Sequence, residues 1–148
     1  MTASTNLNQG SRPKSFTRFV PAIVRTLMGL GFTAFGVIGL FHLMPQPKTL
    51  PPGVAEFMGG LQASRYFLPL LFATQLLVGI LLLFNLFVPL ALVLIMPVLV
   101  NIILYHIFLD PSGIVPGAIL MAFDLYLAWV YRKAYRPLLT MRTRPNED

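Results

Sequence analysis

Residues 67–109 read FLPLLFATQLLVGILLLFNLFVPLALVLIMPVLVNIILYHIFL, an apolar run that contains no Asp, Glu, Lys or Arg. A helix needs about 20 apolar residues to cross the hydrocarbon core of a bilayer, so this run is about twice as long as one crossing requires. Asn85 and Pro89 interrupt it near its middle and predict a tight turn between two helices. We therefore expect spans over about 66–84 and 88–109, with Pro97 bending the second.

Two further apolar segments flank this run, over about 20–43 and 114–131. The first is longer than the apolar core of a secretory signal and is followed by MPQP, which does not resemble a cleavage site, so we expect a retained span. The fold class expected is all-α, an integral membrane four-helix bundle over residues 20–136. Polar, basic tails over 1–19 and 137–148 complete the chain.

The connections between the spans contain the residues that end helices. Residues 48–63 hold three glycines and two prolines and predict a loop, with a short interfacial helix around Val54–Met58. Asp110, Pro111, Ser112 and Gly113 predict the next turn. The last helix is expected to continue past the membrane until Pro137 ends it.

Composition excludes several classes of function. The chain is 56% hydrophobic and 11% charged, whereas about a quarter of the residues of an ordinary soluble domain are charged. With no cysteine it can form no disulfide, redox dithiol or cysteine metal site. Its net charge of +6 is concentrated toward the tails, which favours anionic lipid headgroups and the bilayer as partners and gives no indication of nucleic-acid binding.

The distribution of basic residues predicts the orientation. Lys and Arg near the ends of spans are retained on the cytoplasmic side of a membrane. The loop before the second span offers only Lys48 and Arg65, so we expect both termini in the cytoplasm of a multi-pass protein. The basic residues on the expected inner side are Arg12, Lys14, Arg18, Arg25, Arg132, Lys133, Arg136, Arg142 and Arg144.

Small residues recur on one face of the first span at steps of four and three. Small side chains let membrane helices approach closely, so this face is expected to point into the bundle, as is a similar face of the fourth span. The two sets are Ala22, Thr26, Gly29, Thr33 and Gly36, and Gly117, Met121, Asp124, Ala128 and Tyr131.

Polar residues inside the spans are the candidate ligand-binding residues. Counted at about 1.5 Å per residue, Thr33, Gln75, Asn101 and Asp124 fall near one mid-membrane level. A carboxyl at that depth is costly and normally faces protein or a water-filled cavity. If their faces converge, these groups bind a polar headgroup; alternatively, they bond only to one another and fix the packing of the helices.

Three polar residues are expected near the outer side, namely His42, Glu56 and His106. Two histidines at span ends are compatible with a haem or metal site, but no cysteine or adjacent carboxylate supports it, and hydrogen bonding at the interface is the alternative. We therefore assign no metal site and no catalytic residue. Arg25 lies closer to the inner side than Asp124, which favours a side chain that extends to the interface over a counter-ion.

Several stretches resemble the DoxX family of small bacterial four-helix membrane proteins, over about residues 22–139. The resemblance is carried by RTLMGLGFTAFG from Arg25, EFMGGL from Glu56 and QLLVGILLL from Gln75, and in the third span by PLAL from Pro89, PVLVN from Pro97 and His106. It implies a location in the bacterial inner membrane and association with quinone-linked redox complexes. Relatives often carry glutamate at the position of Gln75, so a role that needs a second membrane carboxylate does not transfer.

Two functional hypotheses follow from different classes. The first is a quinone- or lipid-binding subunit of a membrane redox complex with protein partners, in which Gln75, Asn101 and Asp124 hold the headgroup and quinone is the cofactor. The second is a non-catalytic transport or assembly protein, in which the same residues form a proton or solute path or only stabilise the bundle. Neither gives the chain a redox centre of its own, so no independent enzyme activity is expected.

Overall fold

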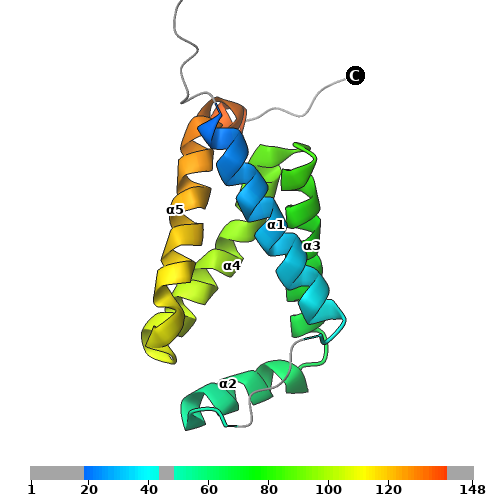
Figure 1. Ribbon diagram of the computed structural model, residues 1–148, viewed down its shortest axis with the longest axis vertical. Coiled ribbons are helices and arrows are strands. Elements are labelled where there is room, and N and C mark those ends of the chain that lie inside the picture. Colours follow the sequence, from blue (N-terminus) through cyan, green and yellow to red (C-terminus); the bar gives the residue numbers. More distant parts are fainter. Residues whose placement is uncertain (1–18, 44–48, 140–148) are drawn as a thin grey trace, which may run out of the picture.

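The computed structural model describes residues 19–43 and 49–139, which contain helices and no strands (Figure 1). The tail residues 1–18 and 140–148, and Lys48 with the MPQP sequence before it, lie outside the described part, and with them six of the basic residues used to predict orientation. The helices are α1 (Val20–Leu40), α2 (Pro52–Ala63), α3 (Phe67–Leu83), α4 (Val88–Phe108), η2 (Pro111–Gly113), α5 (Ile114–Val130) and η3 (Arg132–Leu139).

Three helical segments are long and apolar enough to cross a membrane, namely Val20–Leu40, Val88–Phe108 and Pro111–Val130. The pair α2 and α3 passes the same test as a unit but is bent by 87° at its break, so up to four segments qualify. The four long helices begin and end close to the expected spans; α1 ends at Leu40 instead of near residue 43.

The long helices form a ring in the order α1, α3, α4, α5, with each helix packed against its two neighbours. We call the end where α1 begins and α5 ends the tail end, and the opposite end, where α2 lies, the loop end (Figure 1). The contact between α1 and α3 is the most extensive. Toward the loop end the α1–α3 pair and the α4–α5 pair diverge.

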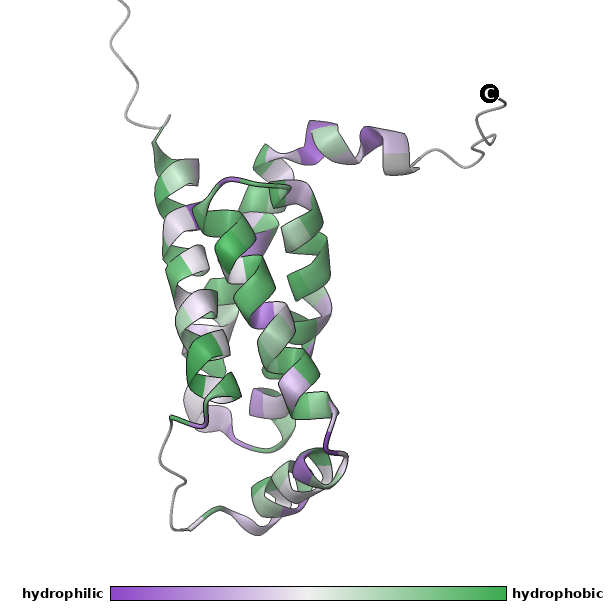
Figure 2. Ribbon diagram, turned by 90° about the vertical axis from the view of Figure 1, so that its right-hand side faces the viewer, coloured by the Kyte–Doolittle hydropathy of each residue, from purple (hydrophilic) through white to green (hydrophobic). Residues whose placement is uncertain are grey.

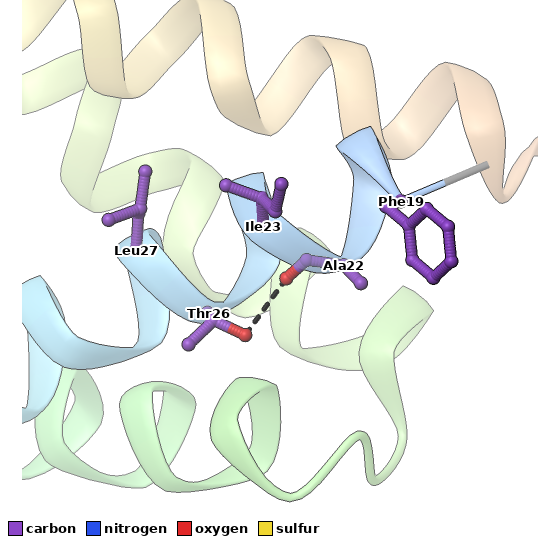
Figure 3. A pocket seen from close by; sticks show the side chains of 5 residues that line it. All are labelled: Phe19, Ala22, Ile23, Thr26 and Leu27. Atoms are coloured by element: carbon purple, nitrogen blue, oxygen red, sulfur yellow. Dashed lines mark hydrogen bonds between the residues drawn. The ribbon is translucent and has the colours of Figure 1, made fainter. Parts of the chain in front are cut away.

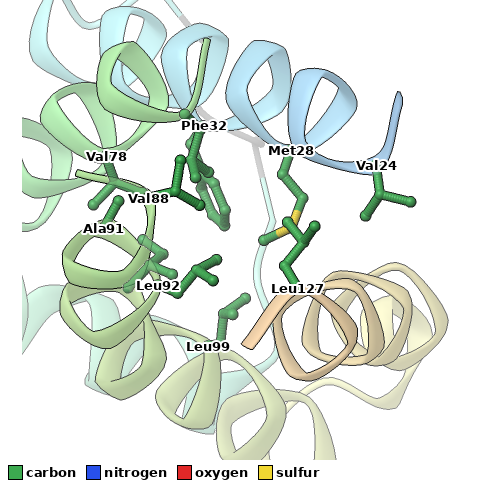
Figure 4. Close-up of a cluster of buried hydrophobic side chains, with 11 residues drawn as sticks. Val24, Met28, Phe32, Val78, Val88, Ala91, Leu92, Leu99 and Leu127 are labelled. Carbon is green, nitrogen blue, oxygen red and sulfur yellow. The ribbon is translucent and has the colours of Figure 1, made fainter. Parts of the chain in front are cut away.

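The apolar core occupies the half of the bundle nearer the tail end. Five side chains of α4 are buried, from Val88 to Leu99, whereas none between residues 100 and 108 is buried. Figure 4 shows Met28 and Phe32 of α1 directed toward the α4 and α5 side chains Leu92, Leu99 and Leu127. The outer surface is also apolar, as the green colouring of the helices in Figure 2 shows.

Left-handed residues follow α1, α2 and α3, and those after α1 and α3 form the same capping motif. Asn85, at φ 57°, follows α3, and the Leu86 N–H donates to the Leu81 carbonyl at 2.8 Å. His42, at φ 53°, follows α1 in the same way, with the Leu43 N–H on the Ile38 carbonyl at 2.9 Å. This six-to-one bond with a left-handed residue is the Schellman motif. It gives the tight turn expected at Asn85.

Two local expectations are corrected by the structure. The interfacial helix expected around residues 54–58 is longer, because α2 runs over Pro52–Ala63. The α-helix expected to continue to Pro137 ends at Val130 and is followed by the 3₁₀ segment η3, which contains Pro137. The Tyr135 hydroxyl donates to the Pro89 carbonyl at 3.0 Å, which holds η3 against the start of α4.

Candidate functional site

Glycine residues allow α1 and α3 to pack closely along the seam between them. A Cβ on Gly36 would lie 2.6 Å from the Leu76 backbone nitrogen, and one on Gly79 would lie 2.5 Å from that of Thr33. Only glycine permits this approach of two backbones. The Gly29, Thr33 and Gly36 part of the small-residue face of α1 therefore packs on α3. Ala22 and Thr26 of the same face are exposed, so the expectation that the whole face points into the bundle is wrong for its first part.

Thr33 and Gln75 lie along this seam. Thr33 contacts Gly79, one turn after Gln75, and Gln75 precedes Leu76. The exposed fraction of Gln75 is 7%. The Thr33 Oγ1 and the Gln75 Oε1 are buried, and neither has a hydrogen-bond partner among the described residues. A buried polar atom without a partner costs about 1–3 kcal/mol, so these two atoms require an explanation.

Asp124 is the other polar side chain of the interior. Its exposed fraction is 1%, and neither carboxyl oxygen has a hydrogen-bond partner within residues 19–43 and 49–139. Asp124 lies near the middle of α5, and Gln75 near the middle of α3. Because α3 and α5 are not neighbours in the ring, these two buried side chains come from helices on opposite sides of the bundle.

Tyr135 lies on the tail-end side of Asp124. Burial raises the pKa of the Tyr135 phenol, and the negative charge of Asp124 raises this pKa further. The phenol is fixed by its bond to the Pro89 carbonyl. Sequence reasoning missed this neighbour, because Tyr135 lies beyond the last expected span and no local pattern relates it to Asp124.

Asn101 does not join the other polar residues. It is exposed on the face of α4 opposite to the buried residues Ile95 and Leu99. Counting residues from a helix end gives depth along the axis but not direction around it. Of the four candidate residues, the structure therefore places Thr33, Gln75 and Asp124 inside and Asn101 outside.

The residues expected near the outer side differ in their environment. His42 and Glu56 are exposed, and His42 follows the end of α1. His106 is half-buried, its Nδ1 lies 2.7 Å from the Asp110 carbonyl oxygen, and its ring packs on Gly113. Among the described residues there is no group of three or more His, Asp or Glu side chains that could hold a metal ion.

Arg25 is half-buried on α1, and its Nε atom is enclosed without a hydrogen-bond partner in the described part of the chain. The neighbouring surface carries a shallow pocket. Its lining consists of Phe19, which precedes α1, and four residues of α1 (Figure 3). The polar group drawn there, the Thr26 hydroxyl, donates to the Ala22 carbonyl of its own helix at 2.8 Å. This pocket therefore offers an apolar surface and little polar recognition.

Comparison with protein-family models, with curated proteins and with solved structures finds no match to this chain. The resemblance to the DoxX family therefore rests on the sequence stretches quoted above.

Proposed function

We propose that this chain is an integral membrane protein of four spans, with both termini in the cytoplasm of a bacterial cell. The outward side chains support this, because large apolar residues such as Leu30, Phe35 and Leu70 are more than half exposed. Water-soluble monomers rarely expose contiguous apolar surface beyond a few hundred Å². Lipid is the solvent that such a surface fits.

Cysteine labelling tests this topology directly, because the chain has no cysteine of its own. Ser112→Cys at the loop end is expected to react with a membrane-impermeant maleimide in intact spheroplasts. Ser11→Cys in the amino-terminal tail is expected to react only after permeabilisation. Labelling of both in intact spheroplasts, or release of the protein from membranes by alkaline carbonate, would contradict the topology.

Within this bundle, we propose that Thr33, Gln75 and Asp124 bind the headgroup of a membrane-soluble ligand, a quinol or a lipid. One observation carries the proposal: the buried Gln75 Oε1 and both Asp124 oxygens accept no hydrogen bond in the described structure. These atoms are acceptors when Asp124 is ionised, so they fit a ligand that donates. The hydroxyl groups of a quinol donate, as do the hydroxyl or amine groups of lipid headgroups.

The fit to a quinone ligand depends on its redox form. Quinone oxygens accept hydrogen bonds, and the Thr33 hydroxyl, the Gln75 amide nitrogen or a protonated Asp124 can donate to them. The quinol form also satisfies the orphaned acceptors. A bound quinol would supply two-electron redox chemistry to a partner, and the residues of this chain would orient its headgroup and exclude water. Such a protein would act as a subunit of a membrane redox complex.

The test is mass spectrometry of molecules extracted from the detergent-purified protein. Wild type is expected to carry a quinone-class molecule or one lipid class in stoichiometric amount, and Asp124→Asn and Gln75→Leu are expected to lose it. Thr33→Val is expected to retain less of it than wild type, and Thr26→Val is the matched control, because the Thr26 hydroxyl is satisfied by its own helix. Bulk lipid alone in every preparation would remove the motivation for the binding proposal.

A second candidate function is favoured by the position of Tyr135. The Tyr135 phenol interacts electrostatically with Asp124 and is bonded to the Pro89 carbonyl at the tail end of the bundle. Carboxyl groups inside a membrane span, as Asp124 would be, are components of proton relays in pumps and transporters. Reconstituted vesicles under a pH gradient test it: proton flux that Asp124→Asn abolishes would support transport, and flux equal to empty vesicles would exclude it.

A further inference from the structure

Asn101 lies in an exposed stripe along α4 that nothing else in the described chain covers. We define the α4 outer stripe as the residues that share this side of the helix with Asn101, namely Leu90, Leu94, Pro97, Asn101, Leu104 and Phe108, all of them exposed. The Asn101 carboxamide has no hydrogen-bond partner within residues 19–43 and 49–139. The rest of the stripe is apolar.

The spacing of the α4 outer stripe alternates between four and three residues. This is the spacing of the a and d positions of a heptad, the seam along which two helices pack as knobs into holes. In that pattern Asn101 occupies an a position, because it follows Pro97 by four residues and precedes Leu104 by three. A single asparagine at an a position fixes the register and the number of helices that associate.

The apolar residues of the α4 outer stripe do not distinguish this side of α4 from its other sides, because α4 is apolar on most of its surface. The carboxamide is what distinguishes this side of the helix. In hydrocarbon its amide protons and its oxygen would all lack partners, which is costly. Pro97 adds to the need for a polar neighbour, because it has no N–H to donate to the Val93 carbonyl one turn earlier.

The chemistry of Asn101 identifies the occupant as a second copy of this chain. A carboxamide both donates and accepts, so two asparagines related by a two-fold axis satisfy each other. Copies inserted in the same orientation present their α4 helices in parallel, and residues of equal number then meet at equal depth. A lipid tail offers neither donor nor acceptor to this group.

We propose that the α4 outer stripe is a self-association surface, at which two copies pack their α4 helices in parallel with Asn101 paired to Asn101 of the second copy. The inference rests on the proposed membrane insertion of α4. It is independent of the ligand proposal, because Asn101 points away from Gln75 and Asp124. The dimer would leave the α1 and α3 surfaces free for other partners.

Oxidative cross-linking in native membranes tests the surface. Leu94→Cys and Leu104→Cys, on the two sides of Asn101 along the stripe, are expected to form covalent homodimers, whereas the matched exposed positions Ile119→Cys and Leu125→Cys on α5 are not. Asn101→Leu, combined with Leu104→Cys, is expected to lower the association constant about three- to tenfold, as measured values for hydrogen bonds between membrane helices indicate.

Each outcome of this experiment decides the proposal. Equal cross-linking at the α4 and α5 positions, or cross-linking of Leu104→Cys to a different protein only, would overturn it. Recovery of the protein in the carbonate-soluble fraction would instead refute membrane insertion, so failure of the premise is visible separately. The substitution Asn101→Gln keeps the carboxamide and is expected to retain more dimer than Asn101→Leu; the reverse order would also overturn the pairing.

Discussion

Gly79 of α3 lies against Thr33 of α1 so closely that a Cβ on residue 79 would meet the Thr33 backbone nitrogen at 2.5 Å. Neither backbone can yield without separating the two helices. We expect Gly79→Ala to lower the free energy of unfolding by about 1–3 kcal/mol, the usual cost of overpacking a tight interface. Unfolding of the purified protein in mixed micelles, followed by circular dichroism, measures this change.

Gly31 provides the control on the other side of α1. A Cβ there meets nothing within 4 Å, so Gly31→Ala is expected to leave stability unchanged or raise it slightly through helix propensity. Equal destabilisation by the two substitutions would show that the α1–α3 seam is not the contact that the structure describes.

His42 is in the left-handed region at φ 53°, where a residue with a Cβ is strained. We expect His42→Gly to raise the free energy of unfolding by about 0.5–1 kcal/mol, because glycine adopts this conformation without that strain. Ala118→Gly, at an exposed position inside α5, should have the opposite sign. Destabilisation by His42→Gly would instead indicate that its imidazole makes a contact that matters, and would revive a functional role for this histidine.

Tyr135 fixes η3 to the bundle through its hydrogen bond to the Pro89 carbonyl. Tyr135→Phe removes that bond and is expected to cost about 0.5–1.5 kcal/mol of stability. Hydrogen exchange of the amides in η3 should accelerate in the same variant. Tyr131→Phe is the control, because the Tyr131 phenol has no hydrogen-bond partner among the described residues. Equal effects of both substitutions would contradict a specific role of the Tyr135 bond.

The sequence predicted the positions of the long helices because hydropathy and helix-breaking residues both mark them. Asn85 and Pro89 located the turn before α4, and the glycines of α1 identified its packing face. The direction of Asn101 was not predictable in the same way. A helix that is apolar all round has no amphipathic face, so depth can be counted but the side that faces the core cannot be read.

The candidate site, like the fold, could be predicted from the sequence only in part. Asp124 stands out in any apolar span, and its place among small residues of α5 predicted that it points inward, where the structure has it. Tyr135 was not accessible, because its contact with Pro89 joins residues 46 positions apart through a 3₁₀ segment that replaces the expected helix. Such contacts depend on where a chain turns after leaving the bundle, which local patterns do not specify.

Asp110 supplies a test of the turn between α4 and α5 through its titration. The Ser112 hydroxyl donates to the Asp110 carboxylate at 2.6 Å, and this bond, followed by the one from the Ser112 backbone N–H at 3.2 Å, lowers the pKa of Asp110. A carboxyl whose pKa is lower in the folded state stabilises the fold above its unfolded pKa. That contribution is lost as pH falls from about 3.8 through the folded value.

Ser112→Ala removes the stronger of the two bonds, so the pKa of Asp110 is expected to rise toward its ordinary value. The stability difference between wild type and this variant should be present at pH 6 and should shrink as acid protonates Asp110 in both. Carboxyl chemical shifts of labelled aspartate and unfolding at two pH values measure the two effects. Ser64→Ala is the control, because the Ser64 hydroxyl bonds the Leu61 carbonyl and the Phe67 N–H and no ionisable group. If the effect of Ser112→Ala on stability is as independent of pH as that of Ser64→Ala, the Asp110 carboxylate does not hold the turn. Packing of His106 on Gly113 would then hold it.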